Sequence, residues 1–348
     1  MATEIAQTTG AQYTAILGLG VYRPARVVTN DEVAGPIDSS DEWIHTRSGI
    51  RTRRFADETE TIHSMSVAAA RGALDAAGIA ADQVDCVIVA TSTHLLLTPA
   101  AGPRIATELG TNGSAAFDIS AGCAGFCHGL AMASDLIRGG TSSYVLVIGV
   151  EKLTDTVNPT DRGTAFLFAD GAGTVVVGPA DAAGIGPTVW GSDGTQHHAI
   201  RQDKDWMEFF AEIDEKGTDA VRPYLAMEGT AVFRWAAHSL EKVCRDAVDR
   251  AGLSTDDLNA MIPHQANGRI IEIMARVLKL PEDCALADDI EEAGNTSAAS
   301  IPLAMEALLR TGRSKPGDSA LLIAFGAGLS YAAQVVTLPP FSPPRPLS

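Results

Sequence analysis

One of the five cysteines lies in a setting that suits a nucleophile. Cys123 follows a strand-like run that ends in small residues, and it falls in the first turn of a helix expected to continue to about Arg138. Unpaired backbone N–H groups and the helix dipole at such a position favour a thiolate, and the small neighbours leave room for a substrate. The same pattern also fits a small apolar residue packed at a helix start, so the local sequence leaves both roles open.

Cys127 and His128 lie one turn further along the same expected helix and could suggest a metal pair. Two ligands on one helix make an incomplete site, and no matching Cys/His pair occurs elsewhere in the sequence. We therefore predict no metal. The other cysteines stand in strand, helix and loop patterns without chemical partners, and we interpret them as packing residues: Cys86, Cys244 and Cys284.

Two further polar residues follow buried apolar patterns in the second half of the chain. His264 comes after a predicted strand and before a helix expected over residues 268–279, so it should project at the carboxyl end of that strand. A lone histidine at such a position is often structural. Asn295 precedes a helix running toward Arg310, and its simplest role is that of an N-cap. The glycine-rich turn at Ala327 follows the last long strand, and its N–H groups could form an oxyanion hole.

The elements that position these residues are repeated. Residues 77–88 reappear half a chain later as residues 251–262, and in both copies a helix ends at a glycine and a buried strand follows. A second pair matches the helix end and strand of residues 136–150 with those of residues 308–325. The separation of Cys123 and Asn295 in the sequence nearly equals the offset between the two copies of the repeat. A pseudo-twofold axis relating the copies would therefore bring these two residues face to face.

Short β-branched runs alternate with helical patterns, which predicts an α/β fold of mostly parallel sheets covered by helices. The cleft should lie where strand carboxyl ends meet helix amino ends, and it should draw on both halves. Residues 196–225 have no counterpart in the first half, so we predict an insertion that forms a lid or wall of the pocket. The predicted divisions are a flexible N-terminus (1–12), two similar halves (13–179 and 180–338) and an extended, frayed proline-rich tail (339–348).

Composition excludes several classes of protein. With 46% hydrophobic and 20% charged residues, the chain can bury a large core. Its formal net charge of −17 repels phosphate backbones, and no stretch is locally basic, so we predict no nucleic-acid partner. No apolar run approaches the roughly 18 residues that cross a bilayer, and the polar first dozen residues lack a secretory pattern. We predict a cytoplasmic protein with free thiols and no membrane partner.

Several segments together resemble β-ketoacyl-acyl-carrier-protein synthase III, the initiating condensing enzyme of fatty-acid synthesis. The matching segments occur in the same order as in the family, from about Tyr13 to Leu338, and they include residues 41–50 and 161–173. It implies the thiolase fold, in which duplicated α/β halves form five layers in the order αβαβα. The segments that resemble the family's active site are residues 118–126, 264–267, 294–300 and 325–328.

The resemblance implies a role for each candidate residue. It makes Cys123 the acyl-accepting nucleophile, with His264 and Asn295 holding the malonyl thioester carbonyl, and with the backbone N–H groups of Cys123 and Ala327 as the oxyanion hole. It also implies a homodimer, acyl-CoA and acyl carrier protein as partners, and no cofactor or metal. The residues implied in substrate docking are Trp43, Arg47 and Arg162 for CoA, and Arg269 and Arg276 for the carrier protein.

The implied reaction is a decarboxylative Claisen condensation of an acyl-CoA primer with malonyl-acyl-carrier protein through an acyl-cysteine, which initiates fatty-acid or polyketide synthesis. The alternative is a thiolase-fold acyltransferase that passes the acyl group to a hydroxyl or amine without decarboxylation. This sequence departs from the family pattern at Gly268, at Ala327, in residues 95–97 and in the insertion. These departures leave the primer, the pathway and the carrier protein undetermined.

Overall fold

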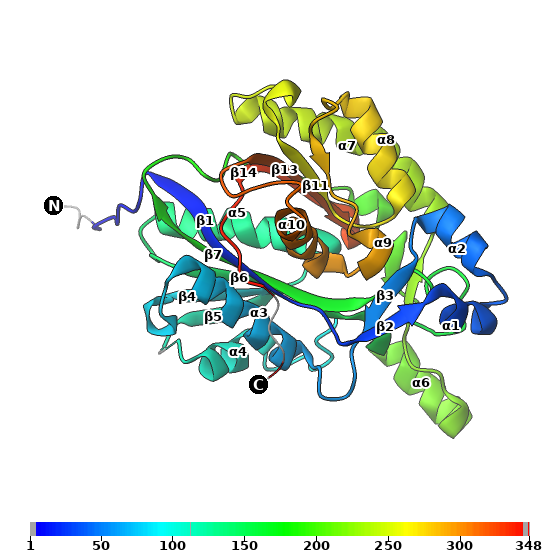
Figure 1. Cartoon of the computed structure of the whole chain (residues 1–348). Helices are drawn as coiled ribbons and strands as arrows, with labels where there is room; N and C mark the ends of the chain where they lie inside the picture. Colours follow the sequence, from blue (N-terminus) through cyan, green and yellow to red (C-terminus); the bar gives the residue numbers. More distant parts are fainter. Residues whose placement is uncertain (1–4, 112, 344–346, 348) are drawn as a thin grey trace.

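A computed structural model describes residues 5–111, 113–343 and 347. Parts of both predicted terminal segments, residues 1–4 of the N-terminus and residues 344–346 and 348 of the proline-rich tail, lie outside the described residues. The described chain forms two five-stranded sheets and two small two-stranded sheets. Figure 1 shows the two large sheets with helices between them and on both outer faces.

The first large sheet has the strand order β1-β7-β6-β4-β5. Strands β6, β4 and β5 are parallel, whereas β7 runs antiparallel to both β1 and β6. Most residues of the central strands are buried on both faces. The bounds are β1 (Tyr13–Tyr22), β4 (Cys86–Ala90), β5 (Ala115–Ile119), β6 (Val145–Lys152) and β7 (Asp170–Ala180).

The second large sheet repeats this plan with the order β12-β11-β13-β14-β8. Here β12, β11 and β13 are parallel, and β14 runs antiparallel to β13 and β8. Both sheets are therefore mixed, and the prediction of mostly parallel sheets is wrong for β7 and β14. The bounds are β8 (Val189–Ser192), β11 (Ala260–Pro263), β12 (Ala285–Leu286), β13 (Ser319–Gly326) and β14 (Ser330–Thr337).

In the second sheet the antiparallel pair follows from a short connection, whereas in the first sheet the longer segment between β6 and β7 gives no such reason. Only the turn η9 (Ala327–Leu329) separates β13 from β14, and a parallel crossover needs about a dozen residues or more. Such a turn can only return the chain antiparallel. The same turn carries one of the candidate oxyanion-hole residues, so the chain reversal and the site share a segment.

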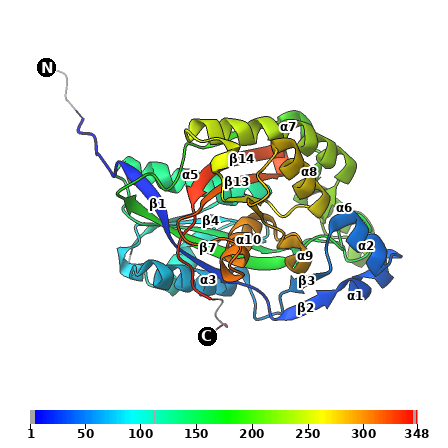
Figure 2. The same cartoon turned by 45° about the horizontal axis from the view of Figure 1, so that its top comes forward.

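Six helices complete the layers. Helices α3 and α4 cover the outer face of the first sheet, α5 and α10 lie between the sheets, and α7 and α8 cover the second sheet (Figure 2). The middle pair is mostly buried and rich in small residues, which lets two sheets approach it. The bounds are α3 (Ile62–Ala77), α4 (Ala101–Leu109), α5 (Gly125–Arg138), α7 (Gly229–Arg250), α8 (Gly268–Leu278) and α10 (Ser300–Arg310).

The sequence repeat is visible in the fold. Helix α3 ends at Gly78 and α7 is followed by Gly252, with φ angles of +66° and +73° that favour glycine. Strands β4 and β11 follow, and α5–β6 and α10–β13 form the second matching pair. The order of layers and the matching strand orders confirm the duplicated five-layer α/β architecture.

Smaller elements lie around these layers. Strands β2 (Arg26–Thr29) and β3 (Thr52–Phe55) form one ribbon, and β9 (Ile200–Gln202) and β10 (Leu225–Met227) form another. The remaining helices are α1 (Asn30–Ala34), α2 (Asp41–Ser48), α6 (Trp206–Lys216) and α9 (Ile290–Ala293). Helix α6 projects from the body of the protein and buries none of its residues (Figure 1).

Backbone hydrogen bonds hold both described ends of the chain. The Gly10 amide donates to the Arg138 carbonyl over 3.1 Å, at the end of α5. The Leu19 amide in β1 donates to the Pro340 carbonyl over 3.1 Å, and the Ser342 amide donates back to Leu19 over 3.0 Å. The start of the proline-rich tail is thus bound along β1, which differs from the expected frayed end.

Candidate active site

One cavity of about 720 Å³ collects most of the candidate residues from both halves of the chain. Cys123 comes from the turn before α5, His264 from the end of β11, and Asn295 from the turn before α10. All three line this cavity. Of the other candidates, only Arg276 lies outside the lining, and those within it are Trp43, Arg47, Arg162, Arg269 and Ala327. The predicted cleft between the halves is therefore present.

Cys123 lies in the 3₁₀ turn η3 (Gly122–Ala124), which leads into α5. It stands just ahead of the helix, whereas the sequence placed it within the first helical turn. The side chain is half-buried, and burial raises the pKa of its thiol to about 12, against a smaller lowering by a hydrogen bond with Ser297. The resting group is a protonated thiol, so the expected preference for a thiolate is wrong for the unliganded enzyme.

Two close approaches bring the turn of β13–β14 against the nucleophile. A Cβ atom at Gly326 would lie 2.4 Å from the Cys123 nitrogen, and one at Gly122 would lie 2.8 Å from the Ala327 nitrogen. Both contacts are too short for any side chain, and Gly122 also has a φ of +51°. The backbone amides of Cys123 and Ala327 therefore lie close together at one wall of the cavity, as a two-donor oxyanion hole requires.

His264 follows β11 and is almost completely buried, with 2% of its surface exposed. Its Nδ1 atom lies 2.7 Å from the Ser300 hydroxyl, and its ring meets Phe325 edge-on at 5.6 Å between centroids. Burial lowers the pKa of the imidazole to about 3, so the ring is neutral at physiological pH. A Ser300 hydroxyl that donates to Nδ1 leaves Nε2 protonated as a neutral donor.

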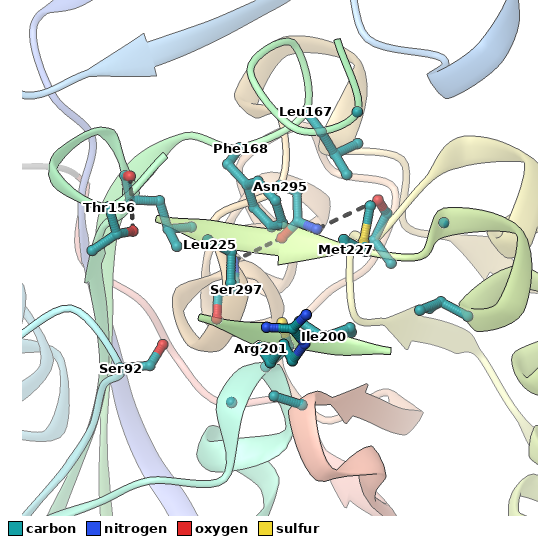
Figure 3. A pocket seen from close by; sticks show the side chains of 18 of the residues that line it. Ser92, Thr156, Leu167, Phe168, Ile200, Arg201, Leu225, Met227, Asn295 and Ser297 are labelled. Atoms are coloured by element: carbon teal, nitrogen blue, oxygen red, sulfur yellow. Dashed lines mark hydrogen bonds between the residues drawn. The ribbon is translucent and has the colours of Figure 1, made fainter. Parts of the chain in front are cut away.

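Asn295 is held by bonds to its backbone and to its side chain. Its backbone amide donates to the Leu167 carbonyl over 2.9 Å. The Ser297 amide donates to Oδ1 over 2.9 Å, and Nδ2 makes a longer bond of 3.4 Å to the Ala266 carbonyl; both side-chain bonds are dashed in Figure 3. Because Oδ1 is occupied, the amide presents its N–H groups as donors.

A cluster of one tryptophan and two arginines lies at another part of the cavity. The guanidinium carbons of Arg47 and Arg162 lie 5.2 and 4.9 Å from the centre of the Trp43 ring, and Phe166 meets that ring edge-on. Neither arginine pairs with a carboxylate in the part of the chain that is described. This cluster offers a ring face and two uncompensated positive charges, which suits a nucleotide with phosphates.

The two arginines expected to dock a carrier protein lie on α8 but differ in position. Arg269, at the start of the helix, is exposed, lines the cavity and lies over Phe233, with 5.5 Å from its guanidinium carbon to the ring centre. Arg276 lies two turns further along, exposed and outside the cavity lining. The structure therefore places only Arg269 at the pocket.

The insertion forms part of the cavity wall. Strands β9 and β10 carry Ile200, Arg201, Leu225 and Met227 into the lining (Figure 3), and Trp206 of α6 adds to it. Because these residues line the cavity, a sequence change in this segment can alter which substrates the cavity accepts.

Sequence reasoning gave no role to three groups in the site: Glu151, Ser297 and Ser300. Glu151 is wholly buried at the end of β6, and the Ser297 hydroxyl donates to it over 3.0 Å. A carboxylate directly after a long apolar run was the available signal for Glu151. The two serines stand within a segment that the family resemblance had included, yet their contacts arise only on folding.

No group of three metal-ligating side chains occurs in residues 5–111, 113–343 or 347. Over the same stretch, no helix has the length and hydropathy needed to cross a bilayer. Cys127 is buried inside α5, and the neighbouring His128 ring contacts the Ala124 carbonyl at 2.9 Å.

Comparison with family models and known proteins agrees with this geometry. Residues 117–194 match the model of 3-oxoacyl-[acyl-carrier-protein] synthase III, and residues 248–338 match the model of its C-terminal part. The chain is 57% identical to β-ketoacyl-[acyl-carrier-protein] synthase III of Mycobacteroides abscessus, over 97% of this chain and 98% of that protein. It is also 57% identical to the mycobacterial β-ketoacyl-[acyl-carrier-protein] synthase III of Mycolicibacterium paratuberculosis, over 97% and 99% of the two chains.

Solved structures show the same fold. The priming β-ketosynthase of the R1128 polyketide biosynthetic pathway superposes with a TM-score of 0.92 at 45% identity, covering 97% of this chain and 99% of that one. The 3-oxoacyl-(acyl carrier protein) synthase III of Pseudomonas aeruginosa gives a TM-score of 0.86 at 37% identity, with 95% and 100% coverage. From its fold, its site and these matches, the chain belongs to the β-ketoacyl-acyl-carrier-protein synthase III family.

Proposed function

We propose that this enzyme condenses an acyl-CoA primer with malonyl-acyl-carrier protein and releases a β-ketoacyl-carrier protein, coenzyme A and carbon dioxide. The observation that carries the proposal is the convergence of Cys123, His264 and Asn295 on one cavity. The reaction needs one nucleophile and two neutral donors, and these side chains supply them. Family membership supports the same reaction, and transfer to a hydroxyl or amine acceptor is not favoured by the relatives.

In the first half-reaction, the Cys123 sulfur attacks the thioester carbonyl of acyl-CoA. Negative charge develops on the carbonyl oxygen, and the amides of Cys123 and Ala327 are the donors that we assign to it. The carbon–sulfur bond to CoA then breaks with its electron pair on the CoA sulfur, which takes up a proton to replace the one that Cys123 loses, and an acyl-cysteine remains. Gly122 and Gly326 keep the two amides close, because neither carries a side chain that would separate them.

In the second half-reaction, malonyl-carrier protein enters and loses carbon dioxide. The electron pair of the broken carbon–carbon bond forms an enolate whose charge lies on the thioester oxygen. Neutral donors stabilise that oxygen without trapping it, and we assign this role to His264 Nε2 and Asn295 Nδ2. The enolate carbon attacks the acyl-cysteine and expels the Cys123 thiolate.

The entrance carries the charges that these substrates need. We assign the CoA nucleotide to Trp43, Arg47 and Arg162, where an aromatic face lies beside two unpaired arginines. An acidic carrier protein must approach a chain of net charge −17, which requires local positive charge. We assign carrier-protein docking mainly to Arg269, and we place Arg276 at the periphery of the docking surface.

We further propose that the enzyme works as a cytoplasmic homodimer without a cofactor. The outer edge of β5 has no partner strand in the described chain, and Leu95, Leu96 and Leu97 are exposed nearby in sequence. Open strand edges and exposed apolar side chains both favour association. Light scattering after size-exclusion chromatography would give the mass of the dimer if this is right and that of one chain if it is wrong.

Intact-mass analysis after exposure to a panel of acyl-CoAs tests the proposed nucleophile and identifies the primer. We expect one added acyl group, which peptide mapping places on Cys123. The other cysteines are buried and lie outside the cavity lining, so they should stay free. An acyl group on Cys127, or none with any acyl-CoA, would contradict the assignment.

A further inference from the structure

Arg53 is a wholly buried arginine that stands behind the cavity wall and has no role in either half-reaction. It belongs to β3, and none of its surface is exposed. In the part of the chain that the structure describes, no carboxylate forms an ion pair with it. Burying a charge without such a partner costs stability, so the groups that Arg53 contacts point to its role.

The guanidinium group of Arg53 joins two distant parts of the chain. Its Nη2 atom donates to Asn30 Oδ1 over 2.6 Å and to the Phe166 carbonyl over 2.9 Å. Its Nη1 atom makes a longer bond of 3.4 Å to the Val28 carbonyl, in the neighbouring strand β2. Arginine suits this position because its planar group donates in several fixed directions at once. Arg53 therefore ties the β2–β3 ribbon to Phe166, which lines the cavity.

On one side the network reaches α2, the helix that carries Trp43. Asn30 Nδ2 donates to the Asp41 carboxylate over 2.7 Å, at the first residue of α2. The same atom donates to the Ile50 carbonyl over 2.8 Å, two residues after the helix ends. Both ends of α2 are thus bonded to the side chain that Arg53 holds, so the position of the Trp43 ring depends on this contact.

On the other side the chain that follows Phe166 reaches both substrate sites. The Phe166 ring meets the Trp43 ring edge-on at 5.3 Å between centroids. The next carbonyl, that of Leu167, accepts the Asn295 backbone amide over 2.9 Å, and the Ala169 amide donates to the Asn295 carbonyl over 2.9 Å. Leu167 and Asn295 lie near each other in Figure 3. The carbonyl that Arg53 holds is therefore next to the one that fixes Asn295.

The stem of Arg53 also packs against the turn that carries Asn295. Gly294, directly before Asn295, has a φ of +65°, and a Cβ atom added there would lie 3.0 Å from Cβ of Arg53. The same atom would lie 3.3 Å from the Leu167 carbonyl oxygen. Arg53 thus limits the position of this turn by contact as well as through hydrogen bonds.

We infer that Arg53 is a positioning residue that fixes the nucleotide site and the enolate donor relative to each other. This inference rests on the proposed function, because it concerns how Trp43 and Asn295 carry out the roles assigned to them. Arg53 reaches neither substrate. It acts through Asn30, which holds α2, and through Phe166, which begins the segment bonded to Asn295.

This role differs from simple stabilisation of the fold in the steps that it affects. Loss of structure would lower every step by the same factor, because it would only reduce the fraction of folded enzyme. Loss of positioning would weaken CoA binding through Trp43 and slow decarboxylation through Asn295. Acylation at saturating acyl-CoA should be spared, because no printed contact joins Arg53 to Cys123 or Ala327 in the described residues.

Arg53→Met removes the donors and keeps an unbranched apolar side chain. Rates are counted per active site, with acyl-Cys123 measured by intact mass. We expect decarboxylation of malonyl-carrier protein to slow about tenfold, because a small displacement of a reacting group is costly. The Kd of CoA, measured by calorimetry, should rise about threefold, and acylation at saturating acyl-CoA should change less than twofold.

Arg54→Met is the matched control. Arg54 is the next residue in β3, and it also donates to backbone carbonyls, those of Pro24 and Ala25, over 3.2 and 3.3 Å. Neither carbonyl belongs to the cavity lining, so this variant should show native values for all three measurements.

Two further variants separate positioning from folding. In an Asn295→Ala background, Arg53→Met should slow decarboxylation less than twofold more, because the side chain through which it acts is already gone. General loss of structure would cost the full tenfold in both backgrounds. Arg53→Lys keeps the charge without the planar fork, and it should give the same pattern at about a third of the size if Arg53→Met does not fold.

The inference is wrong if Arg53→Met and Arg53→Lys behave like Arg54→Met when counted per active site. It is also wrong if acylation at saturating acyl-CoA falls as much as decarboxylation, or if the Asn295→Ala background leaves the full effect. Failure of the proposed condensation would look different, since the native enzyme itself would then release no carbon dioxide from malonyl-carrier protein.

Discussion

The amide of Ser297 donates to Oδ1 of Asn295 over 2.9 Å, and this bond determines what the Asn295 side chain can do. That bond fixes the orientation of the amide, so that Nδ2, which donates one N–H to the Ala266 carbonyl, has its other N–H as the donor for the cavity. An asparagine cannot act as a base, so the position opposite the nucleophile is suited to stabilising an enolate. This is the feature that most directly separates a condensing site from a site that deprotonates an alcohol.

Asn295→Asp should remove that stabilisation without changing the size of the side chain. A carboxylate in place of the donor would repel the enolate, so we expect decarboxylation of malonyl-carrier protein to fall by about 10²- to 10³-fold. Acylation of Cys123 should persist, because Asn295 is not assigned to that step. The two steps are measured separately, by carbon dioxide release and by intact mass. Normal decarboxylation in this variant would contradict the assigned role.

His264 should act as a neutral donor throughout the physiological pH range. Burial lowers its folded-state pKa from 6.5 to about 3, so only the unfolded chain gains its proton as the pH falls below about 6.5. This residue therefore contributes a loss of stability as the pH falls from about 6.5 toward 3, and no change above. The NMR signal of His264 should not titrate between pH 5 and 8. A midpoint near 6.5 would show that the ring becomes charged.

Gly326→Ala should disturb the turn that carries Cys123 and so slow its acylation. The added Cβ atom would lie 2.4 Å from the Cys123 nitrogen, so Cys123 must move away from the Ala327 amide. We expect acylation to slow by about 10²-fold, because a displacement near 1 Å is that costly to a reaction. Gly35→Ala is the matched control, since a Cβ atom added there would meet no other atom within 4 Å. Equal acylation rates in both folded variants would argue against the oxyanion assignment.

Charge reversal on α8 should distinguish the two arginines. Arg269→Glu places a negative charge at the pocket and should raise the KM for malonyl-carrier protein by about tenfold or more, with little change in acylation by acyl-CoA. Arg276→Glu should have a smaller effect on the same KM, because that side chain lies outside the cavity lining. Steady-state kinetics at low and high salt would measure both. A larger effect of Arg276→Glu would reverse the assignment.

Local patterns predicted much of this site. Cys123, His264 and Asn295 each stand where a buried strand or turn gives way to a helix, and the internal repeat indicated that the first and third would face each other. The structure confirms that all three share one cavity. Trp43 and Arg162 depended on the family resemblance alone, because nothing in their local sequence marks a nucleotide contact.

What the sequence could not show is set by contacts between distant segments. The Ser297 hydroxyl donates to Glu151, which lies 146 residues earlier in the chain. The thiol's raised pKa has the same origin, since it reflects burial by several elements and not the local helix start. The antiparallel strand β14 was missed for a different reason: the three-residue turn after β13 was interpreted as a loop of hydrogen-bond donors and not as a chain reversal.

The stoichiometry of carbon dioxide tests the central claim most directly. Acyl-CoA and malonyl-carrier protein are supplied together, and released carbon dioxide and β-ketoacyl product are quantified in the same reaction. The account predicts equal amounts of the two, and the loss of both when Cys123 is replaced by alanine. Formation of an acylated alcohol or amine without malonate, and without carbon dioxide, would contradict the condensation and identify the enzyme as a simple acyltransferase.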